Sequence, residues 1–291
     1  MFSSVLGLIL ALPPPQPALN ESSPILPSIR KTRLDLLLVE LGLAESRSKA
    51  QAIIMAGQVR VNGQMVDRAG ATYAPDAQVM VEAGPRFVSR GGDKLLGALE
   101  TFPINPVGLI CADVGASTGG FSDCLLQHGA ARIYAIDVGK GILHWKLRSD
   151  PRMVVMEETN ARYVEALPEQ VQLVVCDASF ISLKTLLPVI VRWLVTSANL
   201  ITLIKPQFEA GRVDVARGDG VVRDPLIHRR VLEEVLDFAL KQGFVIKGLI
   251  RSPLMGPKGN TEFLAWLTWP GGSAQSEQVE EIGTLINAAL A

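Results

Sequence analysis

The chain has 291 residues, of which 48% are hydrophobic and 20% are charged, and its formal net charge is −1. This balance is typical of a well-cored globular protein and excludes an intrinsically disordered chain. It also excludes a global positive field that would attract nucleic acid, so any such attraction has to be local. At about 150 residues per domain, the length allows two domains.

Residues 1–29 are predicted to be a disordered leader. Their apolar run, residues 5–12, is too short to span a bilayer, and no basic segment precedes it as in a secretory signal. The proline-rich stretch that follows is typical of a flexible segment, and a cleaved signal is the alternative. The cysteines lack metal-ligand spacing, so we expect no metal site and three small core residues in a reducing cytoplasm: Cys111, Cys124 and Cys176.

Residues 30–83 are predicted to form a small module of helices and a hairpin. Leucines recur at helical spacing over residues 34–41, and Ser46 is a good N-cap for a second helix that ends before Gly57. Asn62-Gly63 interrupts an alternating run, which is the strongest short signal for a β-hairpin, and short strand-like runs follow up to residue 81. Basic residues outnumber acidic ones here, so this module is the local region suited to contact phosphates.

Residues 84–92 are predicted to be a linker rich in glycine, proline and arginine, and a helix is expected from Lys94 to Glu100. Lys94 then lies in the first turn of that helix, where a positive charge opposes the helix macrodipole. Such an unfavourable placement hints at a functional role for this lysine.

Residues 109–121 are the centre of the second predicted domain. An apolar run ends in Asp113 and passes through Gly115, Gly119 and Gly120 into an amphipathic segment, which predicts a strand, a glycine turn and a helix start. The glycines let the backbone approach a ligand closely, and Asp137 at the end of the next apolar run would suit a ribose hydroxyl pair. The alternative is an ordinary tight turn without a ligand.

Apolar strands and helices alternate from residue 109 to residue 269. We expect strands over residues 109–113, 133–137, 153–156, 173–177, 199–205, 244–250 and 261–269, and helices over residues 181–194 and 225–242. This alternation predicts the α/β class, with a doubly wound, mostly parallel sheet and ligands at the carboxyl ends of its strands. The last two strands should be antiparallel neighbours. The second domain is predicted over residues 93–270, and residues 271–291 should be a tail with a weak helix.

Polar residues collect where this topology places a site. Lys205 ends a strand and would be partly desolvated, which favours its neutral form, and a second lysine such as Lys94 would favour it further. Asp177 or Glu262 could orient that amine. Two lysines and two carboxylates around a ribose 2′-hydroxyl would suit methyl transfer, because the hydroxyl is a poor nucleophile until its proton is being removed.

Blander interpretations stay open for the same residues. Asp177 and Lys205 could form a structural ion pair, and Glu262 could face solvent. Asn160 could cap a helix or touch an adenine ring. The glycine-rich residues 218–224 are expected to be a mobile loop near the substrate.

Several motifs resemble known families. R-L-D-x-L-L from Arg33, S-R-S-K-A from Ser46 and V-N-G from Val61 resemble the S4 RNA-binding module. The later motifs D-V-G-A-S-T-G-G-F, R-G-G-x-K-L, V-V-C-D-x-S-F-I-S, L-I-K-P-Q-F-E and G-N-x-E-F-L resemble the TlyA family. These are ribosomal RNA methyltransferases, also labelled haemolysin A, in which an S4 module precedes a Rossmann-type, FtsJ-like methyltransferase domain with a seven-stranded sheet.

The resemblance implies a role for each matching residue. Lys205 would be the base, Asp177 and Glu262 its supports, and Lys94 a holder of the target nucleotide. It implies S-adenosylmethionine as cofactor, bound by Asp113, Gly115, Ala116, Ser117, Thr118, Gly119, Gly120, Asp137, Asn160 and Asp177. The expected RNA-binding residues are Arg33, Arg47, Lys49, Arg60 and Arg90.

The family acts on cytidine 2′-hydroxyls, so the resemblance implies ribosomal RNA and ribosomal subunits as partners in the cytoplasm, without stable membrane association. Two alternatives belong to other classes. One is a membrane-active cytolysin, as the haemolysin label suggests. The other is an RNA-binding protein that keeps a methyltransferase fold without catalysis.

Overall fold

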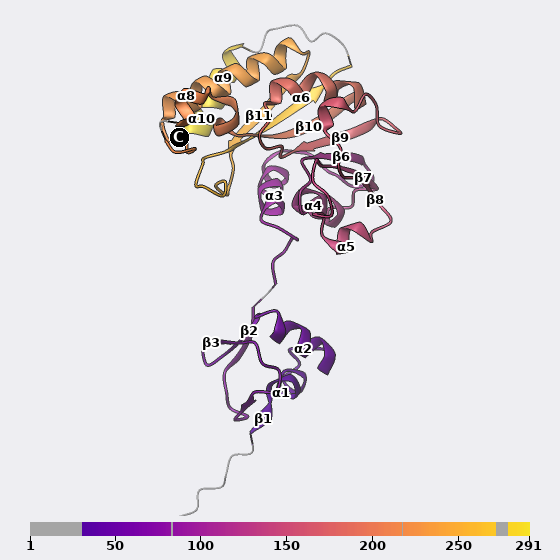
Figure 1. The fold of residues 1–291 in the computed structure, drawn as a ribbon, viewed down its shortest axis with the longest axis vertical. Coiled ribbons are helices and arrows are strands. Elements are labelled where there is room, and N and C mark those ends of the chain that lie inside the picture. The colour runs from indigo at the N-terminus through magenta and orange to yellow at the C-terminus, as the bar shows by residue number, and fades with distance from the viewer. Residues whose placement is uncertain (1–30, 83, 217, 272–278) are drawn as a thin grey trace, which may run out of the picture. The chain divides into compact units, whose positions relative to one another are not determined.

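The computed structural model describes residues 31–82, 84–216, 218–271 and 279–291, so the predicted leader lies outside the described residues. The chain divides into two compact units between Gly84 and Pro85 (Figure 1). Each unit has its own hydrophobic core.

The first unit combines two helices with two small antiparallel sheets. Its elements are β1 (Thr32–Arg33), α1 (Leu34–Glu40), α2 (Arg47–Met55), β2 (Val59–Val61), β3 (Gln64–Val66), β4 (Thr72–Tyr73) and β5 (Val79–Val81). The predicted cap is confirmed, because the Ser46 hydroxyl accepts from the backbone N–H of Lys49 at 3.2 Å. The predicted hairpin is confirmed as well, since Asn62 and Gly63 take positive φ angles of 52° and 80° between β2 and β3.

The second unit is a Rossmann-type α/β domain with a seven-stranded, mostly parallel sheet, as predicted. The strand order is β11-β12-β10-β9-β6-β7-β8, and β12 runs antiparallel to both of its neighbours. The strands are β6 (Ile110–Val114), β7 (Arg132–Ile136), β8 (Met153–Met156), β9 (Val171–Cys176), β10 (Leu194–Ile204), β11 (Val245–Arg251) and β12 (Phe263–Trp269). The expected antiparallel pairing of the last two strands is therefore confirmed.

Helices cover both faces of this sheet (Figure 1). One face packs against α3 (Gly91–Thr101), α4 (Gly120–Gln127) and α5 (Trp145–Arg148), and the other against α6 (Leu183–Ile190), α9 (Pro225–Lys241) and α10 (Val279–Leu290). The shorter elements are η1 (Ala161–Tyr163), η2 (Val191–Trp193), α7 (Pro206–Glu209) and α8 (Arg212–Ala216). Neighbouring strand residues such as Cys111 and Ala112 face opposite cores, as the two-residue period of a strand requires.

The structure differs from the sequence prediction at three element ends. Helix α3 starts at Gly91, three residues earlier than expected, and Gly92 in its first turn packs so closely on the buried Phe87 side chain that a Cβ would not fit. The helix expected over residues 181–194 is the α-helix α6 up to Ile190 and then the 3₁₀-helix η2 over Val191–Trp193, and β10 begins at Leu194. The terminal helix α10 is not a loose tail, since Ile286 is fully buried in the core.

Candidate active site

The turn between β6 and α4 brings the backbone close to its neighbours, which only glycine permits. Gly115 and Gly119 have φ angles of +80° and +96°. A Cβ on Gly115 would lie 2.9 Å from the Cα of Ala178, and a Cβ on Gly120 would lie 2.8 Å from the backbone nitrogen of Gly92. Both contacts are with backbone atoms, which cannot turn aside as a flexible side chain can.

Asp137 follows β7 and is oriented toward this turn by two backbone N–H groups. Its Oδ2 accepts from Ser117 at 2.8 Å, and its Oδ1 accepts from Gly139 at 2.7 Å. A carboxylate has about four acceptor positions, so it can still accept hydrogen bonds from ligand hydroxyls.

A first cleft of about 360 Å³ lies at the carboxyl ends of β6, β7 and β9. Asp137 and Asn160 supply polar groups on its wall, and Ile142, Phe180 and Ile181 supply apolar ones. Asn160 lines this cleft, and the capping role considered from the sequence is confirmed, because its Oδ1 accepts from the Arg162 N–H at the start of η1 at 3.2 Å.

A second cleft of about 500 Å³ adjoins the first one and is lined by all four predicted catalytic residues, Lys94, Asp177, Lys205 and Glu262. The residues that line both clefts are Gly115, Ser117, Asp177 and Ser179. A ligand in the first cleft and a ligand in the second would therefore meet at these shared residues.

Lys205 and Asp177 meet because β9 and β10 are parallel neighbours and each residue directly follows its strand. The Lys205 Nζ lies 2.6 Å from Asp177 Oδ1. It also donates to the Asp177 carbonyl at 3.2 Å and to the Ser179 hydroxyl at 2.8 Å. Lys205 lines the second cleft and is only 7% exposed, and these contacts fix the position of its amine.

Lys94 and Glu262 form a second buried pair, with 2.6 Å between Nζ and Oε2. The other carboxylate oxygen of Glu262 accepts from the Gln207 side chain at 3.0 Å. Glu262 was expected to support Lys205; the hydrogen bonds that its carboxylate accepts among the described residues come from Lys94 and Gln207. This pair also offsets the unfavourable position of Lys94 in the first turn of α3.

The structure places Asp113, which was expected from the sequence to bind the cofactor, away from the lining of both clefts. It is fully buried and lines neither cleft, because the pleat of β6 directs its side chain toward α4. Its Oδ2 accepts from the Ser122 hydroxyl at 2.6 Å, while Oδ1 has no hydrogen-bond partner in the described part of the chain. Burial raises the pKa of this carboxyl group to about 7.

The rest of the expected cofactor set divides between the two clefts. Ala116, Thr118 and Gly120 line the second cleft and not the first. Gly119 lines neither cleft, because it is packed against the side chains of Leu143 and Leu147.

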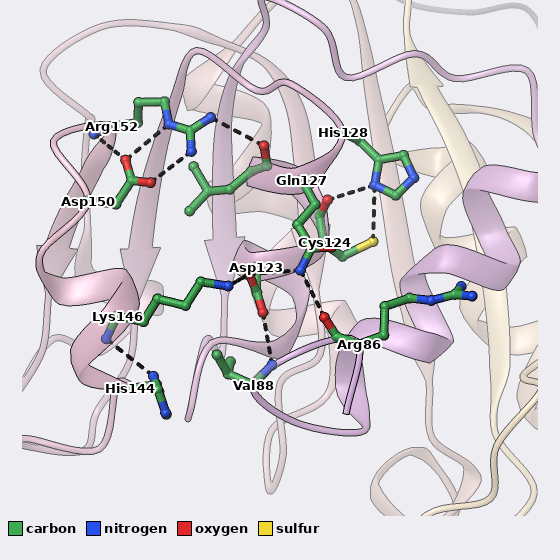
Figure 2. A network of polar contacts seen from close by, with 11 residues as sticks. Arg86, Val88, Asp123, Cys124, Gln127, His128, His144, Lys146, Asp150 and Arg152 are labelled. Atoms are coloured by element: carbon green, nitrogen blue, oxygen red, sulfur yellow. Dashed lines mark hydrogen bonds and ion pairs between the residues drawn. The ribbon is translucent and has the colours of Figure 1, made fainter. Parts of the chain in front are cut away.

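A buried carboxylate on α4 fastens the elements around the turn (Figure 2). Asp123 accepts from the Val88 backbone N–H at 2.9 Å, from Lys146 at 3.1 Å and from Gln127 at 3.1 Å. Gln127 also donates to the Arg86 carbonyl at 3.0 Å. The segment before α3 and the short helix α5 are thereby both tied to α4, which supports the wall of the second cleft.

Three of the predicted RNA-binding arginines engage carboxylates within the first unit. Arg33 and Arg47 each lie 3.0 Å from the buried Asp35, whose pKa is lowered mainly by the hydrogen bond from Arg33. Arg60 pairs with Glu82. Each of these three arginine charges is therefore partly neutralised by a carboxylate of the same unit. The sequence alone did not show these ion pairs.

The other two predicted RNA-binding residues are placed differently. Lys49 is exposed on α2. Arg90 is exposed at the second cleft, where it donates to the Met255 carbonyl at 3.5 Å. Arg90 thus lines the same cleft as the four predicted catalytic residues.

The segment expected to be a mobile loop is anchored at residues 220–222. Asn260 accepts from the Val222 N–H at 2.9 Å and donates to the Gly220 carbonyl at 3.0 Å. The ring of His228 contacts the Val222 carbonyl at 2.9 Å, so this histidine has a structural role.

Sequence reasoning did not single out Ser179 and Gln207, although both lie within quoted motifs. Ser179 belongs to D-x-S-F and contacts the Lys205 amine, and Gln207 belongs to K-P-Q-F-E and contacts Glu262. The sequence pattern that could have identified them is a polar residue two positions after a site residue at a strand end: Ser179 follows Asp177 in this way, and Gln207 follows Lys205.

Two further questions about the described residues concern clusters of metal ligands and helices that could span a membrane. They include no cluster of three or more His, Cys, Asp or Glu side chains suited to hold a metal ion. No helix within these residues is long and apolar enough to cross a membrane. The three cysteines are buried, which raises the pKa of Cys111 and Cys124 to about 12 and that of Cys176 to about 11, as befits core residues.

Fold and clefts together define a class of protein. A Rossmann-type sheet, a glycine turn with an acidic residue after the next strand, and an adjoining cleft with two lysines and two carboxylates describe a methyltransferase. In agreement, the family model of the FtsJ-like methyltransferases matches residues 87–269, and that of the S4 domain matches residues 32–79.

Similar proteins narrow this class to one family. The chain is 48% identical to the Mycobacterium tuberculosis protein named 16S/23S rRNA (cytidine-2′-O)-methyltransferase TlyA, over 82% of this chain and 90% of that protein. It is 42% identical to hemolysin A of Brachyspira hyodysenteriae, over 80% of this chain and 98% of that protein. The chain belongs to the TlyA and hemolysin A family of FtsJ-like methyltransferases.

A solved structure agrees with this assignment. A Streptococcus thermophilus protein provisionally named a hemolysin is 41% identical, with a TM-score of 0.67 over 90% of this chain and 96% of that one.

Proposed function

We propose that this protein transfers a methyl group from S-adenosylmethionine to the 2′-hydroxyl of a cytidine in ribosomal RNA. The observation that carries the proposal is the position of Lys205, a buried amine held by Asp177 at the junction of two clefts. The M. tuberculosis relative, whose similarity extends over most of this chain, is named a cytidine-2′-O-methyltransferase of ribosomal RNA, and this supports the substrate class. A ribosomal RNA substrate implies that the protein acts in the cytoplasm, where ribosomal subunits are found.

The first cleft fits S-adenosylmethionine in size and chemistry. The glycine turn lets the backbone of this region pack closely on Ala178 and on the start of α3, and Asp137 keeps free acceptor positions for ribose hydroxyls. Asn160 and the apolar side chains of Ile142 and Ile181 suit an adenine ring. When bound, this cofactor supplies a methyl group on a positively charged sulfur.

The second cleft provides the groups that act on the nucleotide. Lys205 in its neutral form removes the proton of the ribose hydroxyl, and Asp177 stabilises the ammonium ion that results. Lys94 and Arg90 lie on the same cleft and bring positive charge to the nucleotide, with Glu262 fixing the direction of Lys94. Holding both reactants in line is expected to contribute as much as the basicity of the lysine.

The test is transfer of a labelled methyl group to purified ribosomal subunits. The wild type is expected to methylate a cytidine ribose, and Lys205→Ala should lower kcat by roughly 10²-fold or more, because it removes the base. Lys184→Ala is the matched control, since Lys184 pairs with Glu234 away from both clefts. No ribose methylation by the wild type, or full activity of Lys205→Ala, would contradict the proposal.

The two alternative functions, a cytolysin and a non-catalytic RNA-binding protein, predict different results with the same purified protein. A cytolysin would release dye from liposomes, and removal of residues 1–29 would abolish that leakage if the apolar leader carries it. A non-catalytic RNA-binding protein would bind ribosomal subunits with an unchanged melting temperature on addition of S-adenosylmethionine.

A further inference from the structure

We propose that the hydroxyl group of Ser179 relays the proton of the substrate hydroxyl to Lys205. This inference rests on the proposed function and adds a residue outside the lysine and carboxylate set. It follows from the contacts of the Lys205 amine, from the chemistry of its three partners and from the exposure of Ser179.

Three oxygen atoms surround the Lys205 amine: two accept hydrogen bonds from it, and the third forms an ion pair with it. A lysine ammonium has three N–H donors and no acceptor. The three oxygens around Nζ are Asp177 Oδ1 at 2.6 Å, the Asp177 carbonyl at 3.2 Å and Ser179 Oγ at 2.8 Å. In this state the amine has no lone pair with which to accept a proton from the substrate.

Among these three partners, Ser179 is the one that can reverse its hydrogen bond. The ionised carboxylate and the carbonyl of Asp177 can only accept, whereas a serine hydroxyl both donates and accepts. When Lys205 becomes neutral, its amine can stay beside Asp177 while its lone pair accepts from the Ser179 hydroxyl. The proton therefore enters and leaves the amine on the Ser179 side.

The difference in exposure between Lys205 and Ser179 also supports the relay. Lys205 is 7% exposed at the floor of the second cleft, while Ser179 is exposed and lines both clefts. A ribose hydroxyl at the junction of the clefts can reach the Ser179 hydroxyl without displacing Asp177 from the amine. The serine is thus placed between the solvent-accessible reactant and the buried base.

The step balances with the groups named. The 2′ O–H bond breaks as its proton passes to Ser179 Oγ, and the original Ser179 proton passes to the neutral Lys205 Nζ. The 2′ oxygen forms its bond to the methyl carbon, and the electron pair of the broken carbon–sulfur bond stays on sulfur. Lys205 ends as an ammonium ion beside Asp177 and returns its proton to water through the same serine.

The experiment compares Ser179→Ala and Ser179→Thr in the full-length chain, with labelled S-adenosylmethionine and ribosomal subunits. We expect Ser179→Ala to lower kcat by at least tenfold, while KM for the subunits and the affinity for S-adenosylmethionine change less than about twofold. Ser179→Thr keeps a hydroxyl and should restore most of kcat. Ser149→Ala is the control, because Ser149 is an exposed serine at the end of α5 and lines neither cleft.

The possible results distinguish a failure of the Ser179 relay from a failure of the proposed methyltransferase function. Wild-type kcat in Ser179→Ala overturns the relay alone, and so does an equal loss in the alanine and threonine variants. A loss that lies wholly in KM or in cofactor affinity also overturns it, because it would show a binding role. A wild type that transfers no methyl group overturns the proposed function and the relay with it.

Discussion

Two acidic residues that end neighbouring strands have opposite environments, although their sequence contexts look alike. Asp137 follows β7 at the first cleft and accepts two backbone hydrogen bonds. Asp113 lies one residue before the end of β6 and is fully buried, with one oxygen lacking a hydrogen-bond partner among the described residues. In the register of the two strands these aspartates are two positions apart, and the one inside its strand lies in the core whereas the one just beyond its strand lines a cleft.

The first residue-scale prediction concerns the pH dependence of stability. The unfolded chain ionises Asp113 near pH 3.8, whereas the folded chain keeps its proton up to about pH 7 because burial raises the pKa. The folded state binds the extra proton between these values, so the free energy of unfolding falls as pH rises through this window. From pH 5 to pH 8 this group should cost the wild type roughly 2 to 3 kcal/mol, and Asp113→Asn should remove that loss.

Urea unfolding at pH 5 and pH 8 measures this difference. All four tryptophans lie in the second unit, so their fluorescence reports the unit that contains Asp113. The same pH dependence in the wild type and in Asp113→Asn would show that Asp113 is already ionised in the folded chain below pH 7.

At the scale of the elements, the junction of β6 and α4 connects local backbone geometry to the clefts. The turn approaches the backbone after β9 at Ala178 and the start of α3 at Gly92. Any atom added at the turn therefore pushes on two elements that also carry site residues, namely Asp177 and Lys94.

A comparison of two glycines tests this arrangement. Gly115→Ala should cost roughly 1 to 3 kcal/mol more in stability than Gly108→Ala, because it adds a backbone clash to a shared left-handed conformation. Gly108 has a φ of +75° but nothing within 4 Å of the place where its Cβ would stand, whereas the Cβ of Gly115 would lie 2.9 Å from Ala178. Gly115→Ala should also weaken binding of S-adenosylmethionine.

Thermal melting and calorimetric titration of both variants supply the measurements. Equal losses of stability in Gly115→Ala and Gly108→Ala would mean that the left-handed conformation accounts for the whole cost. They would also mean that the turn can accept a Cβ at Gly115 without a clash.

At the scale of the whole molecule, a chain with net charge −1 has to bind RNA through local positive surface. Much of the positive charge in the first unit is already paired, as Arg33 and Arg47 are with Asp35 and Arg60 is with Glu82. Lys49 is exposed on α2, and the ion pairs of the described residues do not include it. Its charge is therefore more available to a phosphate than the charges of these arginines.

This difference predicts unequal effects on binding to ribosomal subunits. Lys49→Ala should weaken binding and reduce the slope of log K against log salt by about 1, because one phosphate contact is lost. Arg60→Ala should change that slope less, since Glu82 already neutralises its charge. Filter binding over a range of salt concentrations measures both slopes, and a larger change in Arg60→Ala would contradict the assignment.

Local patterns in the sequence were enough to predict the order of strands and helices, the S4 hairpin, and the collection of Asp137, Asp177 and Lys205 at strand ends. These features follow from periodicity, capping and turn residues, which act over a few positions of the chain. The folded structure was needed to show that Glu262 holds Lys94, 168 positions away, that Asp113 is buried, and that Ser179 contacts Lys205. The reason is physical: a side-chain contact between distant segments depends on how whole elements pack, and packing is not encoded in any local pattern.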